Sequence, residues 1–80
     1  MNDTAPITAA PARIIVKLSA REEQIALALA TGSTNREIAS ALGISIKTVD
    51  THRGHILKKL ACRNNVALVL YMVRNGFVTP

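Results

Sequence analysis

The stretch REIASALGISIKTV, residues 36–49, holds two short helical patterns separated by only three residues, Gly43, Ile44 and Ser45. Glycine ends helices because it enters the left-handed conformation without a steric penalty, and serine begins them because its hydroxyl accepts a free backbone N–H. So tight a turn between two short helices, the second of which is cationic, is typical of a helix-turn-helix. We expect its core to consist of Ile38, Ala39, Leu42, Ile44 and Val49.

Serine or threonine followed three residues later by glutamate marks the start of two helices. This pattern is a capping box, in which each side chain accepts a hydrogen bond from the other residue's backbone N–H. Ser19 and Glu22 form it near the start of LSAREEQIALALATG, residues 18–32. Thr34 and Glu37 repeat it at the start of the next helix. One helix therefore precedes the helix-turn-helix.

A fourth helix is predicted in NNVALVLYMVRNG, residues 64–76, with Asn64 as its N-cap and Gly76 at its end. The expected fold is a four-helix, all-α helix-turn-helix domain. Its helices are placed at about residues 19–31, 35–42, 46–61 and 65–75.

The composition fits one small domain. The chain has 80 residues, 49% of them apolar, with one Tyr, one Phe and no Trp, so its core is aliphatic. A single core of this size supplies only about 3–5 kcal/mol, which favours oligomerisation. We assign residues 18–80 to this domain and residues 1–17, with two prolines, to a flexible N-terminal arm or linker. Within that arm, RIIV at residues 13–16 is either a short strand or a hydrophobic staple.

The charge balance favours a polyanionic partner. Ten Lys and Arg outnumber five Asp and Glu, giving a formal net charge of +5. Such an excess suits nucleic acid, an acidic membrane or an acidic protein. The single cysteine, Cys62, excludes an internal disulfide framework. The longest apolar run, residues 66–73, is far shorter than the ~20 residues that span a bilayer, and no signal peptide is recognisable. We therefore expect a cytoplasmic location.

One side of SIKTVDTHRGHILKKL, residues 45–60, is polar and cationic. Val49, Ile56 and Leu60 form an apolar stripe at helical spacing. The opposite side carries Lys47, Asp50, Thr51, Gly54 and Lys58. Short polar groups suit base edges and flanking cations suit phosphates, as in a DNA recognition helix. The alternative is the solvated face of an ordinary amphipathic helix, but the tight preceding turn and the local excess of cations favour DNA.

Taken together, these patterns resemble the LuxR-type (LuxR/FixJ, GerE-like) helix-turn-helix domain of bacterial transcription regulators, from about residue 18 to residue 77. The resemblance is carried by Leu18-Ser19, Arg21-Glu22, Gly32, Asn35-Arg36-Glu37-Ile38-Ala39, Leu42, Ser45, Lys47-Thr48-Val49, His52, Ile56 and Lys59-Leu60. Any one of these motifs is weak, but jointly they are highly specific. The resemblance implies a four-helix domain that dimerises and places its third helix in the major groove of DNA.

The resemblance also implies site residues, position by position. Base-facing roles fall on Asp50, Thr51 and Gly54, with Arg53 and His55 as further candidates for base contacts. Phosphate-facing roles fall on Arg36, Lys47, Thr48, Lys58 and Lys59. A structural pairing of the adjacent Arg21 and Glu22 is expected, rather than two solvated surface charges.

The remaining polar residues point away from catalysis and metal binding. His52 is interpreted as an orienting or phosphate-side contact, because His55 is near it but no third ligand completes a zinc site. Cys62 is assigned to the core. The Ser and Thr hydroxyls are helix caps rather than nucleophiles, since no general base accompanies them. We expect no enzyme activity, no cofactor, no metal and no small-molecule ligand.

The fourth helix is predicted to form a dimer contact. VALVLYMV is apolar on every side, whereas a helix lying on a small core needs only one apolar stripe. Leu68, Val69 and Met72 are assigned to the core. The dimer interface is assigned to Val66, Leu70, Arg74 and Phe77. The alternative is that the chain is simply rich in aliphatic residues.

The sequence thus predicts a transcriptional regulator that binds double-stranded DNA as a homodimer on an inverted repeat, with RNA polymerase as a further partner. One alternative is a stand-alone domain that modulates a full-length regulator by forming mixed dimers. Another is a membrane-surface peptide, which the helix caps and glycine stops argue against. If Met1 is not the natural start, a receiver or ligand-binding domain precedes this chain and the arm is its linker.

Overall fold

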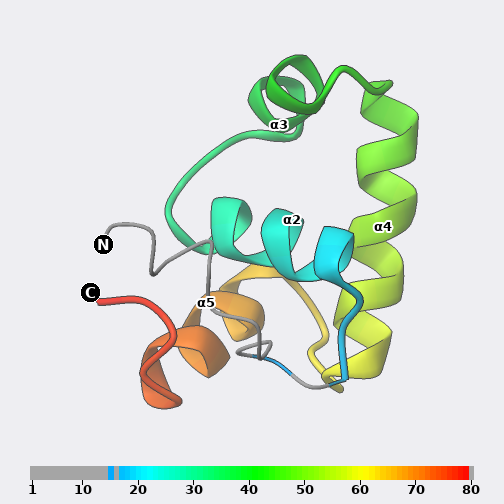
Figure 1. Ribbon diagram of the computed structural model, residues 1–80. Coiled ribbons are helices and arrows are strands. Elements are labelled where there is room, and N and C mark those ends of the chain that lie inside the picture. The colour runs from blue at the N-terminus through cyan, green and yellow to red at the C-terminus, as the bar shows by residue number, and fades with distance from the viewer. Residues whose placement is uncertain (1–14, 16, 80) are drawn as a thin grey trace.

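The computed structural model describes residue 15 and residues 17–79, and within them the chain folds into four helices (Figure 1). They are α2 (Ala20–Ala30), α3 (Asn35–Leu42), α4 (Ile46–Lys59) and α5 (Asn65–Arg74). The predicted all-α architecture is confirmed. Each predicted boundary lies within two residues of the observed one, the usual uncertainty of helix ends.

Helix α2 lies at the centre of the domain and packs against the other three helices (Figure 1). Helices α3 and α4 pack against one another and form the helix-turn-helix, with α3 across the top of the view and the long α4 down one side. Helix α5 lies against α2 on the side away from α3. The arrangement leaves one long side of α4 without a covering helix.

Both predicted capping boxes are present. The Glu22 N–H donates to Ser19 Oγ over 3.1 Å, and the Ser19 N–H donates to Glu22 Oε1 over 2.9 Å. At α3 the corresponding distances between Glu37 and Thr34 are 3.1 and 2.8 Å. Each box satisfies two of the backbone donors that a helix start leaves free. The first turns of α2 and α3 are therefore fixed by local sequence.

The turn between α3 and α4 is set by its three residues. Gly43 has φ 68° and ψ 35°, the left-handed conformation that a glycine adopts at least cost. Ser45 then caps α4, accepting from the Thr48 N–H over 3.0 Å. Asn64 caps α5 in the same way through the Ala67 N–H, at 2.9 Å. The predicted glycine stop and both caps are confirmed.

One aliphatic core joins all four helices. Its buried residues are Ile15, Leu18, Ile25, Ala26, Leu29, Ile38, Ala39, Val49, Ile56, Leu60, Leu68 and Met72. Of the expected helix-turn-helix core, Ile38, Ala39 and Val49 are buried, and Leu42 and Ile44 are half-buried against them. The core therefore fixes the angle at which α3 holds α4.

The core extends into the predicted arm at one residue. Ile15 is buried, its N–H donates to Glu23 Oε2 over 2.7 Å, and its carbonyl accepts the Leu18 N–H over 3.1 Å. The rest of the predicted arm, apart from Lys17, lies outside the described residues. The division of the chain at residue 17 therefore stays a prediction.

Candidate nucleic-acid interface

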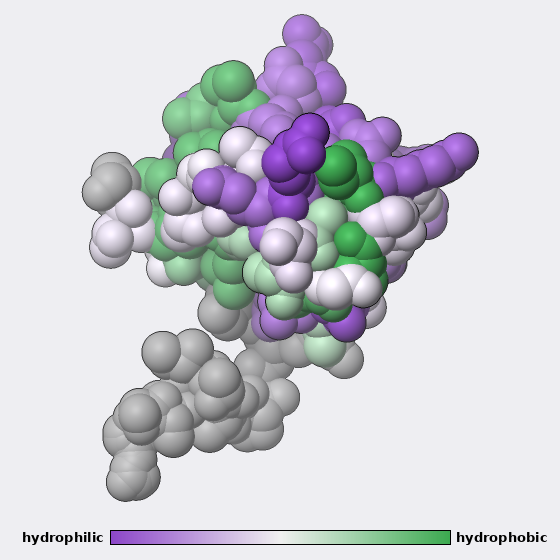
Figure 2. Space-filling model, turned by 90° about the horizontal axis from the view of Figure 1, so that it is seen from above, coloured by the Kyte–Doolittle hydropathy of each residue, from purple (hydrophilic) through white to green (hydrophobic). Residues whose placement is uncertain are grey.

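The polar stripe of α4 faces away from the core. Val49 and Ile56 are fully buried and Leu60 is nearly so. All five residues assigned to the opposite side, Lys47, Asp50, Thr51, Gly54 and Lys58, are exposed. Figure 2 views the domain from the α3 end and shows mainly hydrophilic surface along the edge where α4 lies, broken by a few hydrophobic residues. The helical geometry predicted for this stripe is confirmed.

Thr51 is held by its own helix. Its hydroxyl donates to the Lys47 carbonyl over 3.0 Å, one turn earlier. That bond uses the hydroxyl proton within α4, on a side chain that is exposed to solvent. An exposed methyl group is the part of threonine that contacts the methyl group of thymine.

Gly54 lies in open space. A Cβ built on its backbone would meet no atom within 4 Å, so nothing inside the domain requires glycine here. A glycine inside a helix costs roughly 1 kcal/mol relative to alanine. Packing among the described residues therefore gives no reason for a glycine at this position.

Asp50 and Arg53 form an ion pair on the flank of this stripe. Arg53 Nη2 lies 2.6 Å from Asp50 Oδ1, and Arg53 Nε donates to the same oxygen over 3.2 Å. Arg53 Nη1 also donates to Asn65 Oδ1, at 3.4 Å, on the first turn of α5. Spacing in the sequence made the first contact available, since residues three apart are neighbours on a helix. The contact with Asn65 could not be foreseen.

The other expected contact residues lie at the surface. Arg36, Thr48, Lys59 and His55 are exposed. Thr48 Oγ1 shares a hydrogen bond of 2.8 Å with Ser45 Oγ. Ile46, at the first position of α4, is also 44% exposed. Ile46 was not among the predicted site residues, because an isolated apolar residue carries no sequence signal for contact.

Glu22 pairs with Lys59 and not with Arg21. Lys59 Nζ donates to Glu22 Oε1 over 2.7 Å, and Glu22 is only 5% exposed, whereas Arg21 is exposed. The expected pairing of adjacent residues was wrong because consecutive side chains on a helix point about 100° apart. The pair instead joins the start of α2 to the end of α4, which fixes the position of α4 on the central helix.

This environment lowers the pKa of Glu22. The hydrogen bond from Lys59 is the largest cause, and the backbone N–H of Ser19 is the next. Burial of the carboxyl group acts in the opposite direction, because it disfavours the charged form. The two donors outweigh burial, so the carboxylate is the form that the fold selects.

His52 is half-buried on α4, and its Nδ1 is buried without a hydrogen-bond partner among the described residues. In the described part of the chain, no group of three or more His, Cys, Asp and Glu side chains could hold a metal ion. Cys62 is half-buried against the core and its thiol donates to the Leu60 carbonyl over 3.6 Å. Within the described ranges, no helix has the length and apolar character needed to cross a membrane.

Helix α5 has a buried and an exposed apolar side. Leu68 and Met72 are fully buried, as predicted, and Val69 is half-buried. Val66 is 68% exposed and Leu70 is 45% exposed. These two residues form an apolar surface on a small domain, and exposed apolar surface commonly marks a partner site.

Phe77 does not share that exposed side as fully as predicted. It is half-buried, packs against the core, and its ring centroid lies 6.2 Å from that of Tyr71. The helical wheel does not extend to this residue because α5 ends at Arg74 and Gly76 turns the chain with φ 73°. Arg74 is exposed, as predicted.

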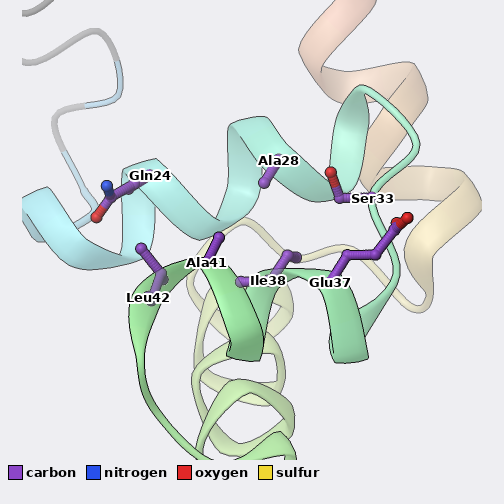
Figure 3. Close-up of a pocket in the computed structure, with 7 residues that line it drawn as sticks. All are labelled: Gln24, Ala28, Ser33, Glu37, Ile38, Ala41 and Leu42. Atoms are coloured by element: carbon purple, nitrogen blue, oxygen red, sulfur yellow. The ribbon is translucent and has the colours of Figure 1, made fainter.

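A small open cavity lies between α2 and α3 (Figure 3). Gln24 and Leu42 are at one end, Ser33 and Glu37 at the other, and small or apolar side chains lie between them. Its volume of about 210 Å³ is below the range of roughly 300–1,000 Å³ typical of ligand pockets. The Glu37 carboxylate in its lining already accepts the Thr34 N–H in the α3 cap.

Comparison with known proteins agrees with this geometry. Residues 16–72 match the family described as bacterial regulatory proteins, luxR family. The chain is 43% identical over 63 residues to the response regulatory protein YgeK of Escherichia coli, 41% over 63 residues to the transcriptional regulatory protein TdiR of Thauera aromatica, and 40% over 67 residues to the response regulator protein VraR of Staphylococcus aureus. These matches cover 79–84% of this chain but only 28–43% of the relatives.

Proposed function

We propose, since this chain belongs to the luxR family of bacterial regulatory proteins, that it binds duplex DNA through α4 in the major groove, as a dimer on an inverted repeat. As a member of that family, the chain is a helix-turn-helix DNA-binding domain of a transcription regulator, and the family is not enzymatic. The proposal concerns three points: that α4 enters the major groove, that the domain dimerises, and that its operator is an inverted repeat.

The exposed polar stripe of α4 is the observation that supports this proposal. It combines the short side chains of Asp50 and Thr51 and the bare backbone of Gly54 with the cations Lys47 and Lys58, all of them exposed. A helix in the major groove reads base edges with side chains near its N-terminal part and contacts phosphates with cations on its flanks. We therefore assign Asp50, Thr51 and Gly54 to the bases, with His55 as a further base contact.

Four cations and one hydroxyl group beside this stripe are proposed to bind phosphates. The set consists of Arg36, Lys47, Thr48, Lys58 and Lys59. Each phosphate that a cation neutralises releases counterions, so the four cations of this set give a slope of roughly −4 per subunit for log affinity against log salt. Titration of a labelled duplex from low to high salt tests this directly. A binding constant that does not change with salt would contradict the DNA-binding role.

We assign the dimer contact to the exposed side of α5, with Val66, Leu70, Arg74 and Phe77. A two-fold dimer presents two copies of α4, so it fits an inverted repeat with half-sites about one helical turn apart. A mixed dimer with a longer family member would use the same surface, which keeps the alternative of a modulating stand-alone domain open.

The variant Leu70→Arg tests the dimer contact, because it places a charge on the apolar surface of α5. Sedimentation should show a folded monomer, and operator binding should weaken strongly. Gln24→Arg is the matched control, since Gln24 is exposed on the α3 side of α2 (Figure 3). If Leu70→Arg stays dimeric, the contact lies elsewhere; if it unfolds, Leu70 supports the core.

The relatives suggest the wider setting. YgeK and VraR are named response regulators, and this chain matches less than half of the length of each. We propose that the domain is the output part of such a regulator, acting in the cytoplasm, with RNA polymerase as its further partner. The reading frame of the full gene would show whether a receiver or ligand-binding domain precedes it.

A further inference from the structure

Asp50 uses only one of its carboxylate oxygens inside the domain. Arg53 Nη2 and Nε both donate to Oδ1, over 2.6 and 3.2 Å. Oδ2 makes no hydrogen bond with any described residue. The Asp50 side chain is 56% exposed, whereas that of Arg53 is 29% exposed. The arginine is therefore the more buried partner of the pair, and Oδ2 of the more exposed carboxylate remains available to an outside donor.

The guanidinium group is itself held from a second helix. Arg53 Nη1 donates to Asn65 Oδ1 over 3.4 Å, and Asn65 is the first residue of α5. A guanidinium group is planar and offers its donors in a fixed fork, so bonds on two sides restrict its orientation. The orientation of the Asp50 carboxylate follows, because two donors of that fork meet one of its oxygens.

We propose that Arg53 is a positioning residue for base readout, which acts on DNA through Asp50. It holds the carboxylate so that Oδ2 accepts a hydrogen bond from the exocyclic amine of a cytosine in the major groove. This inference rests on the proposed function, because it assumes that α4 enters the groove. It assigns Arg53 a different role from the direct base contact expected from the sequence.

Charge gives Arg53 a second effect on the same contact. A lone carboxylate that enters a groove lined by phosphates is repelled by them. With the guanidinium 2.6 Å away, the pair has no net charge, so the repulsion is largely cancelled where the carboxylate meets the bases. Arg53 therefore contributes both to the direction of the Asp50 oxygen and to the affinity of the stripe that carries it.

The test is a double-mutant cycle with base preference as the readout. Parent, Asp50→Ala, Arg53→Ala and the double variant are each used to select from a pool of duplexes with randomised half-sites. We expect the parent to prefer cytosine at one position by about fivefold, the low end for one good base contact. Asp50→Ala and Arg53→Ala should both lose that preference at the same position, and Arg53→Ala should change the base preference no further when Asp50 is already alanine.

Three further variants separate positioning from charge and from folding. Arg53→Lys keeps the charge but loses the fork, so it should retain more affinity than Arg53→Ala while losing the preference. Asn65→Ala should weaken the preference partially. Arg21→Ala, which removes an exposed arginine from α2, should leave the preference unchanged. Circular dichroism of each variant establishes that it is folded.

The possible outcomes are distinct. Loss of one preference in both single variants, with no further loss in the double variant, supports the positioning role. Retention of the preference in Arg53→Ala overturns the positioning role and makes Arg53 a structural residue. Loss of preference at a different base pair when Arg53 is replaced, both in the parent and in Asp50→Ala, also overturns it and makes Arg53 a direct reader of a base. If the parent itself binds no duplex, the proposed function fails and this inference fails with it.

Discussion

Helix α4 carries two ion pairs within the described residues, of almost equal length and in very different surroundings. Lys59 Nζ lies 2.7 Å from Glu22 Oε1, and Arg53 Nη2 lies 2.6 Å from Asp50 Oδ1. The Glu22 side chain is 7% exposed, whereas that of Asp50 is 56% exposed. Distance alone would rank the pairs as equal, but burial decides what each contributes.

The difference follows from water. The two charges of an exposed pair stay hydrated and interact through water, so the pair contributes about 0–1 kcal/mol. A buried carboxylate has lost its water, so removal of its partner leaves a charge that nothing compensates. The pair at Glu22 therefore supports the fold, because it ties α4 to α2. The pair at Asp50 is free to serve a partner, because its loss would disturb the fold little.

Glu22→Ala should have the largest effect on stability. It removes the cap bond to Ser19 and the hydrogen bond from Lys59, and losses of these kinds together amount to about 2–3 kcal/mol. Glu37→Ala is the matched control, because Glu37 forms the same capping box on α3 while exposed. It should cost about 1 kcal/mol or less. Urea unfolding of both variants measures the difference, and equal losses would show that Lys59 adds nothing.

The same carboxyl group should make stability depend on pH. The folded-state pKa of Glu22 lies below its ordinary value of 4.5, so the unfolded chain takes up its proton first as the pH falls. The stabilisation is complete above 4.5 and is lost as the pH falls from 4.5 through the folded-state pKa. Unfolding free energies measured across this range should fall toward acid, and Glu22→Gln should flatten that part of the curve. An unchanged slope in Glu22→Gln would assign the effect to other carboxyl groups.

Lys59→Met should have an intermediate effect, which Lys58→Met should not share. The substitution keeps an apolar chain of similar length but leaves Glu22 without its ammonium partner, at a cost of about 1–2 kcal/mol. The loss is limited because the Lys59 side chain is 45% exposed and Glu22 retains the Ser19 N–H. Lys58 is exposed and should lose less than about 0.5 kcal/mol.

Each lysine variant should nevertheless weaken binding to every duplex by about the same factor, whatever the DNA sequence, because phosphates carry no sequence information. Thermal unfolding together with DNA titration therefore separates the two roles of Lys59, its ion pair with Glu22 and its proposed phosphate contact. If Lys59→Met weakens DNA binding no more than a control substitution, Lys59 serves Glu22 alone.

The sequence predicted those features that depend on neighbours along the chain. Both capping boxes, the glycine at the α3–α4 turn and the buried stripe of α4 arise from spacings of a few residues, and all of them are found. The exposed stripe followed from the same periodicity. Local spacing also made the contact between Asp50 and Arg53 available, although the orientation of their side chains was not foreseen.

What the sequence did not predict depends on the packing of distant segments. Glu22 and Lys59 are 37 residues apart, so their contact exists only once α2 and α4 have packed, and the nearer Arg21 was chosen wrongly. The bond from Arg53 to Asn65 likewise needs the position of α5. Phe77 was misplaced because a helical wheel was continued past the end of its helix. Periodicity indicates which side of a helix is buried but not which helix covers it.

Asp50→Ala should have the smallest effect on stability, although it breaks the shorter of the two ion pairs. The pair is exposed and joins residues one turn apart, a class that contributes about 0.3–0.5 kcal/mol. The change to alanine also improves helix propensity by a few tenths of a kcal/mol, which offsets part of that loss. Unfolding of Asp50→Ala beside Glu22→Ala, at low and at high salt, makes the comparison direct: the first should lie within about 0.5 kcal/mol of the parent.

A loss above about 1 kcal/mol would mean that Asp50 and Arg53 hold α4 against α5, and the carboxylate would then be a structural group that also faces solvent. A negligible loss together with a changed base preference would separate the two ion pairs by role, one for the fold and one for recognition.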